Sequence, residues 1–248
     1  MSHTPVEAAA TVFIVPGLNG HPGLLMRSAP LLFPRWQPLA FNHHLDLAHG
    51  GVPGMAERAL AALDEVTDGP VFICGESFGG TIALTLAHQH PERVLGLILF
   101  STFGWHPSTL ARRGAGALGV WAFLGHRVNN AIYQAGRMAS VPSQLGFSFS
   151  PDLVHDYISR PRANAAAYRA KAELSMTFDA RPWLAELDLP TFVLTGNLDP
   201  VVPISAGREL ARAIPGAELH HLPGGHLVHL VQAQRVGELI ENWARDLH

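Results

Sequence analysis

Gly75-Glu76-Ser77-Phe78-Gly79 is the stretch that decides the fold of this chain. It follows an apolar run, Val71 to Cys74, that predicts a buried strand, and it precedes a helical stretch, Thr81 to His90. A Gly-x-Ser-x-Gly sequence between a strand and a helix predicts a sharp turn that lifts the serine above the edge of a sheet. The helix N-terminus then lies beside Ser77, and its dipole favours negative charge that develops there.

The same rhythm of strands and helices continues on both sides of this turn. Further strands are expected at residues 11–15, 37–41, 94–100, 191–195 and 218–222, and helices at residues 54–67, 205–214 and 228–247. Strands that alternate with helices indicate right-handed βαβ units. The predicted fold class is therefore α/β, with a mostly parallel, twisted sheet flanked by helices.

The rhythm breaks between residues 103 and 180, where no segment reads as a strand. Helix-like segments run over residues 152–159 and 162–178 in this part of the chain. We interpret residues 103–180 as a helical cap inserted into a core domain. That domain consists of residues 1–102 and 181–248.

The apolar residues of this predicted cap have two possible roles. Most of them are expected to form the cap's own core, and some are expected to line a pocket for an acyl group. The candidates for contact with a substrate are Trp105, Trp121 and Phe123. Trp105 lies just after the strand at 94–100, so it is also a candidate for the cap hinge or for plain packing.

Composition excludes several classes of protein. At 248 residues, with 48% hydrophobic and 15% charged residues, the chain fits one well-buried domain with an insertion. The net charge is −3, so we expect no attraction to nucleic acid. Lys171 is the only lysine and does not follow a glycine, which excludes a P-loop.

The single cysteine, Cys74, rules out an intrachain disulfide and is expected to be a buried packing residue. Residues 1–10 carry no basic segment, which argues against a secretory signal. No stretch approaches the ~20 apolar residues of a membrane span. We therefore expect a soluble, cytoplasmic protein of unknown oligomeric state.

Two more polar side chains are expected where a parallel sheet presents its ligands, on loops at the carboxyl ends of strands. Asp199 follows the strand at 191–195 and precedes Pro200, which stiffens the loop. His226 follows the last strand after two glycines. An activated serine needs a general base, and the base needs a group that holds its tautomer. Ser77, Asp199 and His226 are thus the candidate catalytic residues.

At these residues the chain resembles an α/β-hydrolase, from Thr11 to Leu247. The resemblance rests on Gly75–Gly79, on Gly196-Asn197-Leu198-Asp199-Pro200-Val201-Val202-Pro203, on Gly224-Gly225-His226, and on the order Ser, Asp, His along the chain. It implies that Ser77 is the nucleophile, that His226 is the general base and acid, and that Asp199 orients His226.

The resemblance also implies an oxyanion hole formed by the backbone N–H groups of Phe78 and Leu18. Leu18 follows Pro16-Gly17, where members of this family usually have His-Gly. Proline in that place keeps the backbone donor at Leu18, and it argues against the lipase type with a His-Gly-Gly-Gly sequence.

The leading functional hypothesis is hydrolysis of carboxylic esters or thioesters with a mainly apolar acyl group, through an acyl-enzyme and without a cofactor. A serine at position 77 argues against haloalkane dehalogenases and epoxide hydrolases, which resemble this chain but use aspartate there. Hydroxynitrile lyases use a lysine near the catalytic site, whereas Lys171 lies in the predicted cap. Enol-lactonase, carbon–carbon bond hydrolase and a non-catalytic ligand receptor on the same scaffold remain alternatives.

Other candidate site residues are given structural roles. His43, His44, Asp46 and His49 cluster in sequence without the spacing of a known zinc motif, so no metal is predicted. His229 and Glu76 are interpreted as packing or hydrogen-bonding residues. Asp179 and Asp188 are weaker candidates for the role of Asp199, because neither directly follows a strand.

Overall fold

The computed structural model describes residues 10–106, 165–199, 201–245 and 247. Within them, one sheet of parallel strands has the order β2-β1-β3-β4-β5-β6. The strands are β1 (Thr11–Val15), β2 (Gln37–Ala40), β3 (Val71–Glu76), β4 (Val94–Phe100), β5 (Thr191–Gly196) and β6 (Glu218–Leu222). The expected α/β fold class with a parallel sheet is confirmed.

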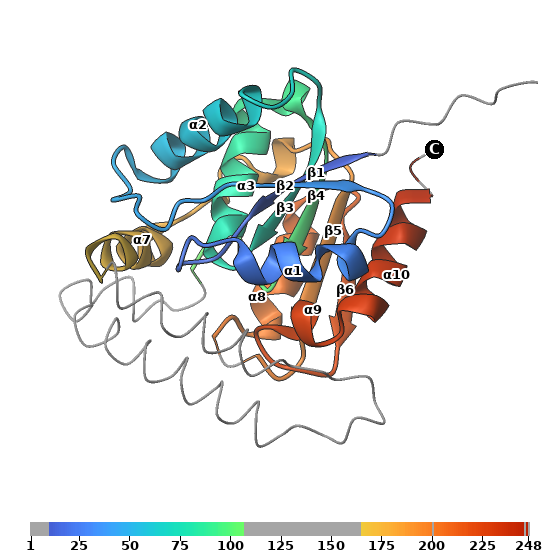
Figure 1. Cartoon of the computed structure of the whole chain (residues 1–248). Helices are drawn as coiled ribbons and strands as arrows, with labels where there is room; N and C mark the ends of the chain where they lie inside the picture. Colours follow the sequence, from blue (N-terminus) through green and yellow to red (C-terminus); the bar gives the residue numbers. More distant parts are fainter. Residues whose placement is uncertain (1–9, 107–164, 200, 246, 248) are drawn as a thin grey trace, which may run out of the picture.

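Helices cover both faces of this sheet (Figure 1). They are α1 (Gly23–Leu32), α2 (Gly51–Asp64), α3 (Phe78–Gln89), α7 (Ala165–Thr177), α8 (Ile204–Ala213), α9 (Val228–Val231) and α10 (Ala233–Arg245), with 3-10 turns at Pro91–Arg93 and Leu184–Glu186. Side chains of α1 and α10 pack in one core, and those of α2, α3 and α8 pack in the other.

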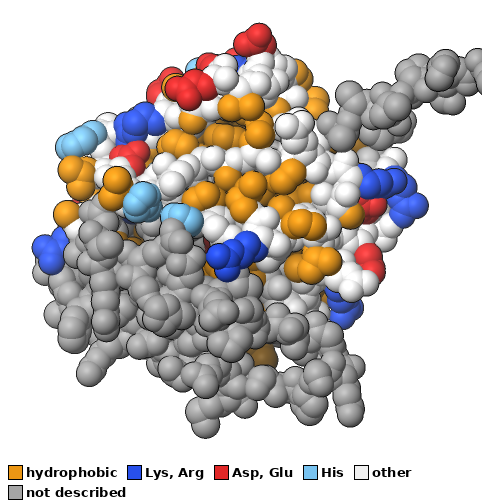
Figure 2. Space-filling model, in the orientation of Figure 1, with side chains coloured by type: hydrophobic (Ala, Val, Ile, Leu, Met, Phe, Trp, Pro, Cys, Tyr) orange, Lys and Arg blue, Asp and Glu red, His pale blue; other side chains and the backbone are white. Residues whose placement is uncertain are grey.

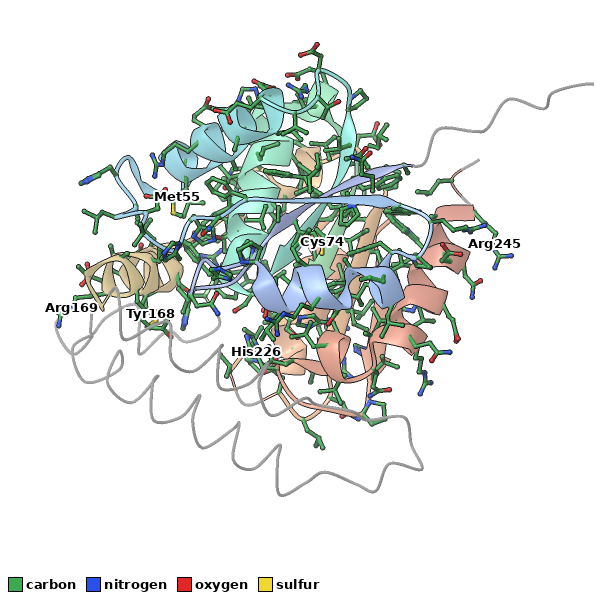
Figure 3. All side chains as sticks on the ribbon, viewed as in Figure 1. Met55, Cys74, Tyr168, Arg169, His226 and Arg245 are labelled. Atoms are coloured by element: carbon green, nitrogen blue, oxygen red, sulfur yellow. The ribbon has the colours of Figure 1, made fainter. Side chains whose placement is uncertain are left out.

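The central strands are buried on both faces, which explains their continuous apolar sequences. Every residue of β3 is buried. Successive side chains of a strand point to opposite faces, so Ile73 joins the core under α2 and α3 while Cys74 joins the core under α1 and α10. Cys74 is fully buried, as expected for a packing residue (Figure 3).

The strand order reverses between β1 and β3. The chain passes from β1 to β2 on one side, and β3 then pairs with the other side of β1. Such a reversal leaves a crevice at the carboxyl ends of the strands, where ligands bind in open α/β sheets. The loop after β1 and the turn after β3 both begin at this point, which sets the position of the site.

The strand bounds agree with the sequence-based expectations to within two residues, whereas the helices differ more: α2, expected at residues 54–67, lies at Gly51–Asp64. The bounds of β1, β4 and β6 are those expected. Helix α1 was not expected from the sequence, and it holds Pro30 in its last turn. The expected closing helix over residues 228–247 is two helices, α9 and α10, separated at Gln232.

The two ends of the predicted cap lie side by side against the core domain. The Ala180 N–H donates to the Gly104 carbonyl at 2.8 Å, and Trp105 and Asp179 form an isolated antiparallel bridge. Helix α7 lies within the segment expected to be helical at 162–178. Most of the predicted cap lies outside the described residues, so the division into two domains stays a prediction.

Two surface properties concern partners. Over the described ranges, no helix is both long and apolar enough to cross a membrane. On the face seen in Figure 2, Lys and Arg side chains are scattered rather than gathered into one patch.

Candidate active site

Ser77 occupies a strained turn between β3 and α3. Its backbone has φ 52° and ψ −122°, a conformation that non-glycine residues rarely adopt. The Ser77 N–H donates to the Phe100 carbonyl at 2.8 Å, and the Thr102 hydroxyl donates to the Ser77 carbonyl at 2.6 Å. These two hydrogen bonds, to the last residue of β4 and to a residue just after it, hold the serine in this conformation.

Glycine is required beside the serine because backbone passes close by. A Cβ on Gly79 would lie 2.1 Å from the Val15 carbonyl oxygen and 2.4 Å from that of Pro16. A Cβ on Gly75 would lie 2.6 Å from the Cα of Gly80. The glycines therefore allow the turn to approach both α3 and the loop after β1, as the Gly-x-Ser-x-Gly pattern indicates.

Of the three residues predicted to be catalytic, His226 lies within hydrogen-bond distance of both others. The Nε2 atom of His226 lies 3.0 Å from Oγ of Ser77, and its Nδ1 atom lies 2.8 Å from Oδ2 of Asp199. Because a carboxylate only accepts, Nδ1 carries the proton and Nε2 is left to accept from the serine hydroxyl. The ring is therefore in the tautomer that a base facing Ser77 needs.

Asp199 is itself fixed by the backbone that follows it. Its Oδ1 accepts the N–H groups of Val201 at 2.8 Å and Val202 at 3.0 Å, which leaves Oδ2 facing His226. The loop that carries His226 approaches the end of β5 closely, since a Cβ on Gly196 would lie 2.3 Å from the Gly225 carbonyl oxygen. His226 thereby lies beyond the carboxyl ends of the strands (Figure 3).

The charges around His226 favour its protonated form and outweigh the opposing effect of burial. Burial lowers the pKa of His226, but the charge of Asp199, its hydrogen bond and the charge of Glu76 together raise that pKa above 6.5. Ser77, Asp199 and His226 are each buried, with exposed fractions of 8–9%. An arrangement of this kind can take a proton from Ser77 and stabilise the imidazolium that results.

The loop after β1 lies against Ser77. A Cβ on Gly17 would come within 3.4 Å of the Ser77 Cβ. The Gly17 N–H donates to Glu76 Oε2 at 3.3 Å, and the Gly17 carbonyl accepts from the Gly20 N–H at 2.9 Å. The Leu18 N–H follows these two bonded groups, and Phe78 opens α3 on the other side of the serine. Their role as an oxyanion hole stays a prediction.

A buried pair of residues, Glu76 and His229, lies behind the triad residues. His229 is fully buried, stacks on Phe100 with ring centroids 4.8 Å apart, and lies 3.7 Å from Glu76 Oε1. Burial, and then the charge of His226, lower the pKa of His229 to about 3. Burial raises the pKa of Glu76, although His226 and the Gly17 N–H act against that rise. With its pKa lowered this far, His229 is neutral, so the pair is not an ion pair.

The histidine-rich loop before α2 has partners other than a metal. His43 Nε2 bonds the Pro16 carbonyl at 3.0 Å, His44 Nδ1 lies 2.8 Å from Asn42, and Asp46 pairs with Arg58 at 2.7 Å. In the part of the chain that the structure describes, no three His, Cys, Asp or Glu side chains gather as metal ligands would. No motif in the sequence indicates that His43 bonds the loop beside Ser77.

The expected substrate contacts have different outcomes. Trp105 is half-buried at the base of the predicted cap, packs against the core, and has the Arg181 guanidinium 5.5 Å from its ring. A contact of Trp105 with a substrate stays a prediction. Trp121 and Phe123 lie outside the described residues.

Comparison with known proteins agrees with the fold. A family model described as the alpha/beta hydrolase fold matches residues 11–233. The chain is 30% identical over 196 residues to a poly(3-hydroxyalkanoate) depolymerase of Ectopseudomonas oleovorans, which covers 76% of this chain and 65% of that protein. The chain therefore spans just under two thirds of the length of that relative.

Two further relatives differ in kind. A pimeloyl-[acyl-carrier protein] methyl ester esterase of Aromatoleum aromaticum is 29% identical over 212 residues, which is 79% of this chain and 84% of that one. The crystal structure of an enol-lactonase from Burkholderia xenovorans superposes with a TM-score of 0.72 at 18% identity, covering 98% of this chain and 94% of that chain. The family match over most of the sequence shows that this chain belongs to the alpha/beta hydrolase fold family.

Proposed function

We propose that this protein hydrolyses carboxylic esters or thioesters through an acyl-enzyme on Ser77. The single observation that carries the proposal is the continuous contact from Asp199 Oδ2 through His226 to Ser77 Oγ, at 2.8 and 3.0 Å. Such a contact makes the serine hydroxyl a nucleophile, because the base that accepts its proton is already in place and in the right tautomer.

The proposed reaction has two steps. Ser77 Oγ attacks the carbonyl carbon while its proton passes to His226 Nε2, and the alcohol or thiol then leaves with that proton. Water next attacks the acyl-enzyme, gives a proton to His226, and releases the acid as that proton returns to Ser77. In both steps the backbone N–H groups of Leu18 and Phe78 stabilise the negative charge on the carbonyl oxygen.

An apolar acyl group is favoured by the surroundings of Asp199. Leu198 and Val201 lie within two residues of Asp199 in the chain and are exposed to 75% and 40%. They offer apolar surface close to Asp199 along the chain. The ester substrate of the related methyl ester esterase supports the same class of reaction.

The experiment is a panel assay of purified protein with p-nitrophenyl esters, acyl-CoA thioesters and lactones. We expect turnover of esters or thioesters, and a Ser77→Ala variant without measurable turnover serves as the control. Turnover of lactones alone would favour the enol-lactonase alternative. Turnover that persists in Ser77→Ala would overturn the proposed mechanism.

A further inference from the structure

Lys171 is an unusual lysine because it is almost fully buried. Only 1% of its surface is exposed, and it is the only lysine in the chain. Burial of an ammonium group is unfavourable unless strong hydrogen bonds replace water. Burial lowers the pKa of Lys171 to about 8, although the charge of Asp46 acts against this shift. Lys171 is therefore not an ordinary surface charge, and the partners of its Nζ atom indicate its role.

The Nζ atom of Lys171 is directed at His43. It donates to the His43 carbonyl at 2.9 Å and lies 3.5 Å from the His43 Nδ1 atom. The two residues are 128 positions apart, one in α7 and one in the loop between β2 and α2. An ammonium group only donates, so the neighbouring Nδ1 atom is the unprotonated nitrogen of the ring.

His43 in turn holds the loop beside Ser77. With Nδ1 unprotonated, Nε2 carries the proton and donates to the Pro16 carbonyl at 3.0 Å. The His43 backbone N–H also donates to the Gly20 carbonyl at 2.9 Å. Burial, and then the charge of Lys171, lower the pKa of His43 to about 4, which keeps the ring neutral and this tautomer in place.

The Pro16–Gly17 peptide is thereby bonded at both of its polar ends. His43 donates to the Pro16 oxygen, while Glu76 Oε2 accepts the Gly17 N–H at 3.3 Å. A peptide unit is planar, so fixing both ends sets its orientation. The next unit is held by its own carbonyl, because the Gly17 oxygen accepts the Gly20 N–H at 2.9 Å. That next unit carries the Leu18 N–H, the proposed oxyanion donor.

We propose that Lys171 is a positioning residue that acts through His43 to aim the Leu18 N–H at the reacting carbonyl. The inference rests on the proposed function, because it concerns the oxyanion hole of that reaction. A donor in the hole acts on the transition state more than on the bound substrate, so its misalignment lowers kcat and leaves KM nearly unchanged.

The test uses the full chain with Lys171→Met, which keeps an unbranched side chain as far as Cε and removes the ammonium group. With p-nitrophenyl butyrate we expect kcat to fall about tenfold to a hundredfold, less than the ~10²–10³ for complete loss of one donor. KM should change by less than about twofold, since uniform binding is not altered. Arg169→Met is the matched control, because Arg169 is exposed on the same helix (Figure 3) and should leave kcat unchanged.

A double-mutant cycle separates this role from a purely structural one. His43→Phe should lower kcat to a similar extent, and adding Lys171→Met to it should lower kcat no further. His43→Phe also provides an independent reading if Lys171→Met does not fold. Additive losses, or a loss confined to thermal stability, would overturn the inference.

The outcomes also distinguish the inference from the proposed function. A wild-type protein that neither turns over p-nitrophenyl butyrate nor reacts with a fluorophosphonate at Ser77 would end the proposed function. A wild-type protein that does react, together with Lys171→Met and His43→Phe variants whose kcat equals that of wild type, would end the inference alone.

Discussion

The Nε2 atom of His226 lies 3.0 Å from Oγ of Ser77, although 149 positions separate the two residues. The turn after β3 supplies one and the loop after β6 supplies the other. Because both loops leave the same edge of a parallel sheet, their side chains meet without any local sequence contact.

The Asp199→Asn substitution is predicted to be nearly inactive. Val201 and Val202 donate to Oδ1, so the amide oxygen would take that place and the amide N–H would face His226. The ring would then carry its proton on Nε2 and could not accept one from Ser77. We expect kcat for ester hydrolysis to fall by about 10⁴-fold, as in other triads. A fall of less than about tenfold would contradict the assignment of Asp199.

The pH dependence of kcat/KM should report the pKa of His226. Protonated His226 cannot accept the serine proton, so activity is lost as the pH falls through that pKa. Burial lowers this pKa, but Asp199 and Glu76 raise it above 6.5. We expect the acidic limb of the profile to have its midpoint above 6.5. A midpoint below 6.5 would indicate that the charge of Asp199 does not raise the pKa of the His226 ring.

Much of the fold can be predicted from the sequence, because the patterns that indicate its strands and turns are local. Strand β4 is continuously apolar and ends at a clear boundary. The Gly-x-Ser-x-Gly turn is recognised by the spacing of its two glycines and its serine. Helix α1 was missed because Pro22, Pro30 and Pro34 make its segment look like a loop. Its Pro30 is tolerated close to the C-terminal end of the helix.

The candidate site can be predicted from the sequence only in part. Ser77, Asp199 and His226 each follow a recognisable strand, so topology alone suggested that they meet. The contacts of His43 with Lys171 and Pro16 follow from no repeat or motif, since they join a loop, a helix and another loop across the core. The same is true of the stacking of His229 on Phe100.

Glu76 is predicted to contribute to stability through the hydrogen bond that it accepts. Burial raises its pKa, and Oε2 accepts the Gly17 N–H at 3.3 Å. Glutamine is the uncharged isostere of this carboxyl group, so Glu76→Gln should change the free energy of unfolding by less than about 1 kcal/mol. Glu76→Ala leaves the buried Gly17 N–H without its acceptor and should cost about 1–3 kcal/mol.

Urea unfolding of both Glu76 variants, followed by circular dichroism, measures these changes. If the Glu76→Gln variant were as unstable as the Glu76→Ala variant, an ionised carboxylate would be required at this position, which would contradict the prediction.

The Gly79→Ala substitution is predicted to be poorly tolerated. Its Cβ would lie 2.1 Å from the Val15 carbonyl oxygen, and backbone there cannot move without shifting β1. We expect a loss of about 3 kcal/mol in the free energy of unfolding, at the upper end for overpacking. Gly69→Ala is the matched control, because the nearest atom to its Cβ is 3.8 Å away. Equal melting temperatures for the two variants would contradict the close approach.

The most direct test of the central claim is mass spectrometry of the protein after reaction with a fluorophosphonate. Such a reagent modifies a serine only when a neighbouring base activates it. The account predicts one covalent adduct per chain, located on Ser77 by peptide mapping, and none in Ser77→Ala. An unmodified wild-type chain, or an adduct on another residue, would contradict it.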